Sequence, residues 1–259
     1  MLATINPTIK AITVFITGVL LAFLYDPITP LIYLIFTILV TFLFGNISLK
    51  RWLMLFTPFV FLSIGFAWMT MLYSSSSYAG GEVVLSFWWF EITRETVMVA
   101  ISLALRSLCF TALSFMFILT TDSTKFMLSL MQQLRLPPKL TFGILAGYRF
   151  LPTFKYELEI LRKAHRIRGV TQSKGIKEKI MQVRRYLLPL LANAIRKAER
   201  VAVAMESKGF TGSRDRTHYH ELRVTKRDWL FLAAFLLVFF GSVLITYQLG
   251  YLNIFGRKI

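Results

Sequence analysis

Residues 161–170 read LRKAHRIRGV and residues 204–210 read AMESKGF, and each stretch places a cation directly before a glycine. Glycine commonly follows the last turn of a helix, and a cation in that turn interacts favourably with the helix dipole. The two stretches therefore predict the C-terminal ends of two long helices. Both lie on one strongly charged segment that is flanked by long apolar runs.

The segment between these apolar runs has its own helical pattern. Pro138 favours a helix start, so the first helix is expected over residues 139–169, with a kink or interruption at Pro152. The second helix is expected over residues 176–208, with Gly209 as its stop. It also carries three alanines at four-residue spacing, which allow another helix to approach closely: Ala194, Ala198 and Ala202.

Composition indicates a membrane protein. Of the 259 residues, 56% are hydrophobic and 17% are charged, with a mean hydropathy of +0.60 and a net charge of +17. Residues 122–227 hold 23 of the 30 Lys and Arg and 8 of the 13 acids, and so carry +15 of that charge. The rest of the chain is nearly neutral and apolar, which is typical of a polytopic membrane protein.

The apolar runs are long enough to cross a bilayer, which takes about 20 helical residues. We expect an all-α polytopic membrane protein with about five transmembrane helices and an arm of long helices between the fourth and fifth spans. Three regions follow: residues 1–121 with four spans, residues 122–227 as the charged arm, and residues 228–259 with the last span. The spans are predicted near residues 9–25, 28–44, 52–73, 97–119 and 229–249.

Positive charge sets the orientation. Lys50 and Arg51 follow the second span and the basic region 122–227 follows the fourth, so both are expected in the cytoplasm together with the N-terminus. The charge distribution thus predicts a multi-pass membrane protein with its basic regions on the cytoplasmic side. The loop 74–96 would be external, and its aromatic run FWWF at residues 87–90 suits an interfacial half-helix.

The sequence argues against catalysis on this chain. It contains no phosphate-binding GxxxxGK[ST] loop, no HExxH zinc pair and no GxSxG nucleophile turn. We expect no metal site, because only His165 accompanies His218 and His220. Arg106 lies inside the fourth predicted span, where a protein partner or an interfacial position is favoured over a place on a substrate path. Any ATP hydrolysis would have to come from a partner.

Several stretches resemble one family. NPTIK at residues 6–10 and ITRETVMVAISLALRSL at residues 92–108 match its pattern, and three cytoplasmic stretches match more specifically. These are TTDSTKFMLSLMQQLRLPPKL at 120–140, YRFLP at 148–152 and LLPLLANAIRKAERVAVAMESKGF at 187–210. The chain resembles the transmembrane T component of energy-coupling factor (ECF) transporters, a family that includes the cobalt-transport permease subunit and is similar to the permease half of an ABC importer.

The resemblance implies a non-catalytic subunit that links two ABC-type ATPases to a membrane-embedded, substrate-binding S component. ATP and Mg²⁺ would bind to the ATPases, with no cofactor on this chain. The resemblance also implies a place in a bacterial or archaeal cell membrane. The family carries two Ala-Arg-Gly signatures that dock on the ATPases, and they align here with Ile167-Arg168-Gly169 and Ser207-Lys208-Gly209. Both have lost the alanine, and the second has lysine in place of arginine, which removes the planar donor fork.

Other functions stay open from sequence alone. A conventional permease would bind substrate itself, and a membrane-tethered binder would use the basic arm on anionic lipid or nucleic acid. We favour the T component, with the lipid bilayer but no nucleic acid among its partners. Its cargo would be a vitamin, a vitamin precursor or a transition-metal ion, and we prefer thiamine or its pyrimidine precursor over cobalt.

Overall fold

The computed structural model describes residues 2–45, 47–73, 83–87, 90–168, 175–215, 217–250, 253–254 and 257–258. The chain divides into two compact units. The membrane unit comprises Met1–Ser129 and Leu222–Ile259, and the arm unit comprises Leu130–Glu221. Helices dominate both units, which confirms the expected all-α fold.

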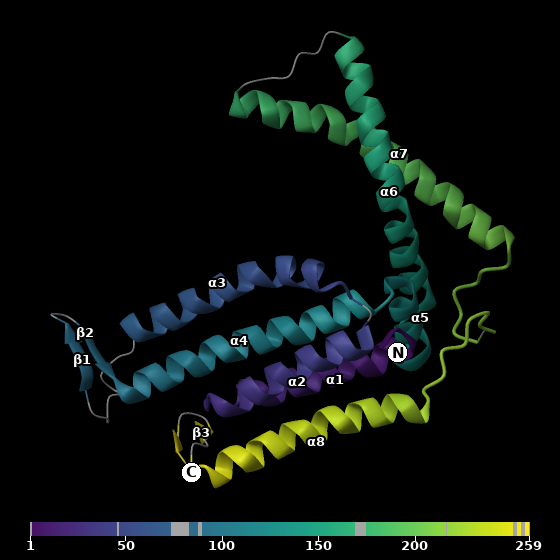
Figure 1. Ribbon diagram of the computed structural model, residues 1–259. Helices are drawn as coiled ribbons and strands as arrows, with labels where there is room; N and C mark the ends of the chain where they lie inside the picture. Colours follow the sequence, from purple (N-terminus) through teal and green to yellow (C-terminus); the bar gives the residue numbers. More distant parts are fainter. Residues whose placement is uncertain are drawn as a thin grey trace. The chain divides into compact units, whose positions relative to one another are not determined.

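In the described part of the membrane unit there are five long helices. They lie side by side in Figure 1. Helix α4 packs against α2 and α3, while α1 and α2 both pack against α8. A short 3-10 helix, Leu2–Thr4, precedes them, and α5, Ser123–Gln133, follows α4. The long helices are α1 (Pro7–Ala22), α2 (Ile28–Gly45), α3 (Leu49–Tyr73), α4 (Arg94–Thr120) and α8 (Lys226–Gln248).

Four of these helices, α2, α3, α4 and α8, are long and apolar enough to cross a membrane. The fifth predicted span corresponds to α1, which is apolar but has 16 residues. At about 1.5 Å per residue it reaches about 24 Å, less than a typical hydrocarbon core of about 30 Å. Helix α1 nevertheless packs between α4 and α8 within the same bundle.

Aromatic rings and threonine hydroxyls fill the inside of the bundle. Tyr33 is fully buried and meets Phe235 and Phe239 edge to face, with ring centroids 6.1 and 6.0 Å apart. The buried hydroxyls of Thr29 and Thr246 lie 3.0 Å apart and join α2 to α8. Lipid offers polar groups no hydrogen-bond partner, so these hydroxyls have to be satisfied inside the protein.

The segment before α4 differs from the sequence prediction. Instead of an interfacial half-helix, β1 (Val83–Phe87) pairs antiparallel with β2 (Phe90–Thr93). The physical reason is composition, because VVLSF and FEIT are rich in the β-branched and aromatic residues that favour strands. Trp88 and Trp89 lie outside the described residues. A second small hairpin joins β3 (Asn253–Ile254) to β4 (Arg257–Lys258).

The arm unit is built on two long helices, α6 (Pro138–Ile167) and α7 (Ile176–Ser207), which contact each other. Pro137 occupies the N-cap of α6 and Pro138 its first turn, where proline needs no intrahelical donor. Both ends of α7 fall within one residue of the prediction. Pro152 does not interrupt α6, which continues past it as a single helix.

Arg106 has partners inside the protein. Its Nη1 donates to the carbonyl oxygens of Ala22 (2.8 Å) and Leu24 (3.3 Å), and its guanidinium lies 4.8 Å from the ring centre of Tyr25. These carbonyls belong to the C-terminal end of α1, where no intrahelical donor remains. The geometry therefore agrees with the expectation that Arg106 has a protein partner, because this residue of α4 caps the end of α1.

We predict that Arg106→Met lowers the free energy of unfolding by about 0.5–1.5 kcal/mol, because it removes the side-chain donor to the Ala22 carbonyl and to the part-buried Leu24 carbonyl. Cys109, the single cysteine, is 0% exposed, so its reaction with a fluorogenic maleimide during heating reports unfolding of this unit. The matched control is Arg51→Met, which removes an exposed cation from α3. Equal unfolding temperatures for the two variants would contradict the capping role.

Candidate coupling site

The first predicted docking end lies at the C-terminus of α6. Arg168 is the C-cap residue and its backbone N–H donates to the carbonyl of Ala164 at 3.2 Å. Its side chain is exposed, and the neighbouring Ile167 is 88% exposed. Gly169, the predicted stop, lies outside the described residues. The end of α6 thus presents an exposed cation next to an exposed apolar side chain.

The second end has a well-defined termination. Helix α7 ends at Ser207, and Gly209 adopts a left-handed conformation with φ +80°. The N–H of Phe210 donates to Met205 O at 3.0 Å, and the N–H of Gly209 donates to Glu206 O at 2.9 Å. This pair of hydrogen bonds is a Schellman motif, which confirms Gly209 as the predicted helix stop. Lys208 is exposed directly before it.

Contacts after Gly209 fix this end against the beginning of α6. The Phe210 ring meets Phe142 of α6 edge to face, with centroids 5.6 Å apart. Gly212 lies beside the Lys139 side chain of α6 and has φ +73°. Glycine adopts this backbone angle without the strain that a side chain would bring. The chain beyond Lys208 is therefore held against the first turns of α6.

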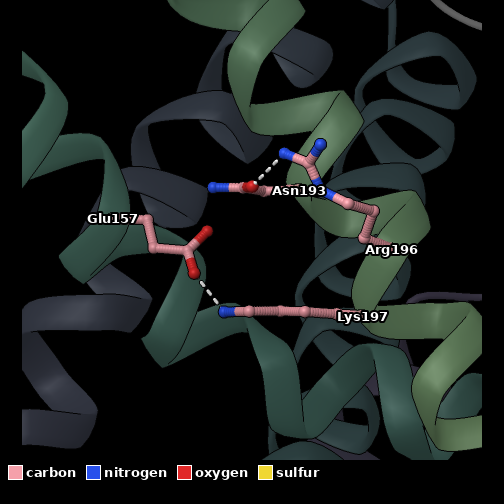
Figure 2. Close-up of polar contacts among 4 residues, drawn as sticks. All are labelled: Glu157, Asn193, Arg196 and Lys197. Carbon is pink, nitrogen blue, oxygen red and sulfur yellow. Dashed lines mark hydrogen bonds and ion pairs between the residues drawn. The ribbon is translucent and has the colours of Figure 1, made fainter.

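Side-chain contacts also join the middle of the two helices. Lys197 of α7 forms an ion pair with Glu157 of α6, as Figure 2 shows. The neighbouring Arg196 instead donates to Asn193 of its own helix at 2.7 Å. Further along the pair, His165 meets the Tyr186 ring, with centroids 5.3 Å apart. The contacts run in opposite sequence directions, so α6 and α7 are antiparallel.

This arrangement separates the two docking cations. Lys208 lies beside Phe210, which contacts Phe142 near the start of α6, whereas Arg168 follows the other end of that helix. The 26 residues from Phe142 to Arg168 span about 39 Å at about 1.5 Å per residue. One small docking groove could not receive both cations.

The predicted packing alanines lie on an exposed face of α7. Ala194, Ala198 and Ala202 are all exposed, and their four-residue spacing places them on one side of the helix. This face continues toward the N-terminal half of α7 with large apolar side chains that are 47–67% exposed. Those residues are Ile180, Leu187, Leu191 and Ile195.

A second group of polar residues received no role in the sequence analysis, although residues 6–10 matched a family pattern there. Lys10 is 1% exposed and Asp228 is 2% exposed, although both are ionisable. The available signals are local: Asn6-Pro7 is a typical helix start, and Thr225-x-x-Asp228 is typical of a capping box. Neither signal indicates that the two residues belong to the same part of the fold.

Comparison with known proteins identifies the family. The family model CbiQ, described as "Cobalt transport protein", matches residues 1–219. The chain belongs to the CbiQ family. This membership agrees with the four helices that are long and apolar enough to cross a membrane.

Curated relatives of this CbiQ-family chain are named "Energy-coupling factor transporter transmembrane protein EcfT". The protein from Exiguobacterium sibiricum is 32% identical over 185 residues, covering 68% of this chain and 66% of the relative. The Bacillus subtilis protein is 29% identical over 83% of this chain and 89% of its own length. The Lactococcus lactis protein is 26% identical over 90% and 89%. The chain is therefore a T component of the ECF type.

We predict opposite effects for two glycine substitutions in the arm unit. Gly209→Ala should destabilise the end of α7 by about 1–2 kcal/mol, because alanine is strained at positive φ. Gly147→Ala, inside α6 with open space around the added Cβ, should stabilise by about 0.5–1 kcal/mol. Amide hydrogen exchange in the last turn of α7 and across α6 measures both effects. Faster exchange in both variants would contradict the assignment.

The crossing of α6 and α7 makes a separate prediction. A double-mutant cycle with Glu157→Gln and Lys197→Met should give a coupling energy of up to about 1 kcal/mol, since the pair is only partly buried. The control cycle replaces Lys197→Met with Arg196→Met and should give none, because Arg196 bonds within its own helix. Exchange rates of α7 amides provide the free energies, and equal coupling in both cycles would refute the pairing.

Proposed function

We propose that this T component couples two cytoplasmic ABC-type ATPases to a membrane-embedded S component that binds the cargo. The observation that carries the proposal is the pair of exposed cationic helix ends, Arg168 and Lys208, at opposite ends of α6. Among the described residues, neither side chain has an ion-pair or hydrogen-bond partner. Each cation is thus available to a groove on a different ATPase.

Mechanical transmission requires that these ends do not move independently. The Schellman motif and the Phe210–Phe142 contact support a fixed backbone position for Lys208. The Glu157–Lys197 pair supports a defined crossing between the two helices. ATP-driven closure of the ATPases would move the docking grooves, and the helices seated in them would carry that movement along α6 and α7.

The exposed face of α7 supports the second half of the proposal. Ala194, Ala198 and Ala202 leave room for a close helix approach, and the adjacent large apolar side chains offer surface to bury. We assign this face to the S component. The S component, and not this chain, would select the cargo. That cargo would be a vitamin, a vitamin precursor such as thiamine or its pyrimidine precursor, or a transition-metal ion.

ATP and Mg²⁺ belong to the partner ATPases in this proposal. The chain contributes docking cations and rigid helices, and its sequence offers no phosphate-binding loop. Lysine at the second end forms a point contact in place of a bidentate one. The unequal ends favour two different ATPases over two identical ones.

The combined substitution Arg168→Ala with Lys208→Ala should abolish transport-coupled ATP turnover while leaving membrane insertion intact. The matched control is Arg184→Ala with Arg200→Ala, which removes the same charge from exposed positions on α7. Uptake and ATP hydrolysis are measured in proteoliposomes with the co-purified partners. Normal uptake by the Arg168→Ala and Lys208→Ala double variant would refute the docking model.

An affinity purification from native membranes tests the partners themselves. The detergent-solubilised chain should retain one or two P-loop ATPases and a small membrane protein, which mass spectrometry would identify. That small protein would also indicate the cargo class. Recovery without any ATPase would instead favour a permease that binds substrate itself.

A further inference from the structure

The polypeptide passes between its two compact units at only two places. It leaves the membrane unit after Ser129 in α5 and returns at Leu222, shortly before α8. Movement that the arm unit passes along the backbone reaches the bundle through these two crossings. If these crossings were flexible, they would absorb the movement of the arm unit instead of transmitting it to the bundle.

Residues 6–10, NPTIK, hold the outgoing crossing. Thr8 Oγ1 donates to Ser129 Oγ at 2.7 Å, and both residues are at most 2% exposed. Lys10 Nζ reaches the end of α4, donating to Thr120 O (3.3 Å), Thr120 Oγ1 (3.1 Å) and Thr121 Oγ1 (3.2 Å). The start of α1 is thereby tied both to the last turn of α4 and to α5.

The same residues hold the returning crossing. The backbone N–H of Asn6 donates to Asp228 Oδ1 at 2.7 Å. Asp228 Oδ2 accepts from the backbone N–H and the hydroxyl of Thr225, at 2.7 and 2.8 Å. One buried carboxylate therefore joins the start of α1 to the start of α8.

Lys10 also fixes the chain that precedes α1. Its Nζ donates to the carbonyl of Leu2 at 2.8 Å, and the Asn6 side chain accepts from Thr8 N at 3.0 Å to cap α1. Buried, fully hydrogen-bonded polar networks are stiff, because every displaced partner leaves an unsatisfied group in a low dielectric. The ammonium of Lys10 and the carboxylate of Asp228 give this segment its charged contacts.

We propose that residues 6–10 form a junction clasp that positions both crossings as one rigid block, so that movement of the arm unit reaches the bundle. The predicted effect on transport rests on the proposed coupling function. The hydrogen bonds that hold the two crossings do not. In this proposal Thr8, Lys10 and Asp228 are positioning residues. They act on transport without touching the cargo, the ATPases or ATP.

The geometry is tested on the full chain alone. In a Cys109→Ala background, spin labels at Lys125→Cys in α5 and Lys226→Cys in α8 report the distance between the two crossings. We expect a narrow distance distribution that broadens markedly with Lys10→Met or Asp228→Asn. The exposed controls, Lys50→Met and Asp215→Asn, should leave it narrow. A distance distribution that stays narrow in both Lys10→Met and Asp228→Asn overturns the proposal, regardless of any effect on transport.

The consequence is tested in the assembled transporter in proteoliposomes. With Lys10→Met or Asp228→Asn, ATP turnover per complex should persist while cargo transported per ATP falls about tenfold, the factor that corresponds to about 1.4 kcal/mol. Lys10→Arg should restore most of the ratio. If transport and ATP turnover fall in parallel with the amount of intact complex, or if the ratio is unchanged, the coupling role is overturned.

These outcomes are separate from those of the docking proposal. Loss of both ATPase capture and ATP turnover in the unmodified chain would refute the proposed function, while the spin-label distances would still decide whether residues 6–10 hold the crossings. Broadened distances together with a reduced transport ratio support the clasp as a coupling element.

Discussion

Helix ends inside a bilayer impose the constraint on which this structure depends, because hydrocarbon cannot satisfy terminal carbonyl and amide groups. Here other helices supply the missing partners. Arg106 of α4 donates to the end of α1, and Lys10 of α1 donates to the end of α4. The two helices thus cap each other at opposite ends. A cation that is costly in lipid becomes a specific connection between neighbouring helices.

The arm unit follows a different physical logic. Its helices α6 and α7 are long and mostly exposed, and a few discrete contacts define their antiparallel crossing: Phe142–Phe210, Glu157–Lys197 and His165–Tyr186. Such a pair buries little apolar surface, so its stability depends on partners more than that of a closed core would. Exposed apolar positions on α7 are therefore consistent with a subunit that completes its packing on assembly.

Local signals in the sequence predicted much of this fold. Pro138 at the start of α6 and Gly209 after α7 act through backbone geometry within a few residues, and both were confirmed. The predicted interfacial half-helix was wrong, because the aromatic residues of this segment suit a membrane interface in either a helix or a strand. Contacts such as Lys10 with Thr120 join residues 110 positions apart, and no local pattern specifies them. The docking roles of Arg168 and Lys208 stay predictions.

The two cationic ends differ in ways that bear on partner choice. Arginine at 168 offers a planar fork to a carboxylate or to carbonyl oxygens, while lysine at 208 offers a compact charge on a flexible stem. The fixed backbone after Lys208, through Gly209 and Phe210, offsets part of that loss because it restricts where the ammonium can reach. A groove selected for one end would fit the other poorly. In the docking model that we propose, these differences between the two ends would suit two different ATPases better than two identical ones.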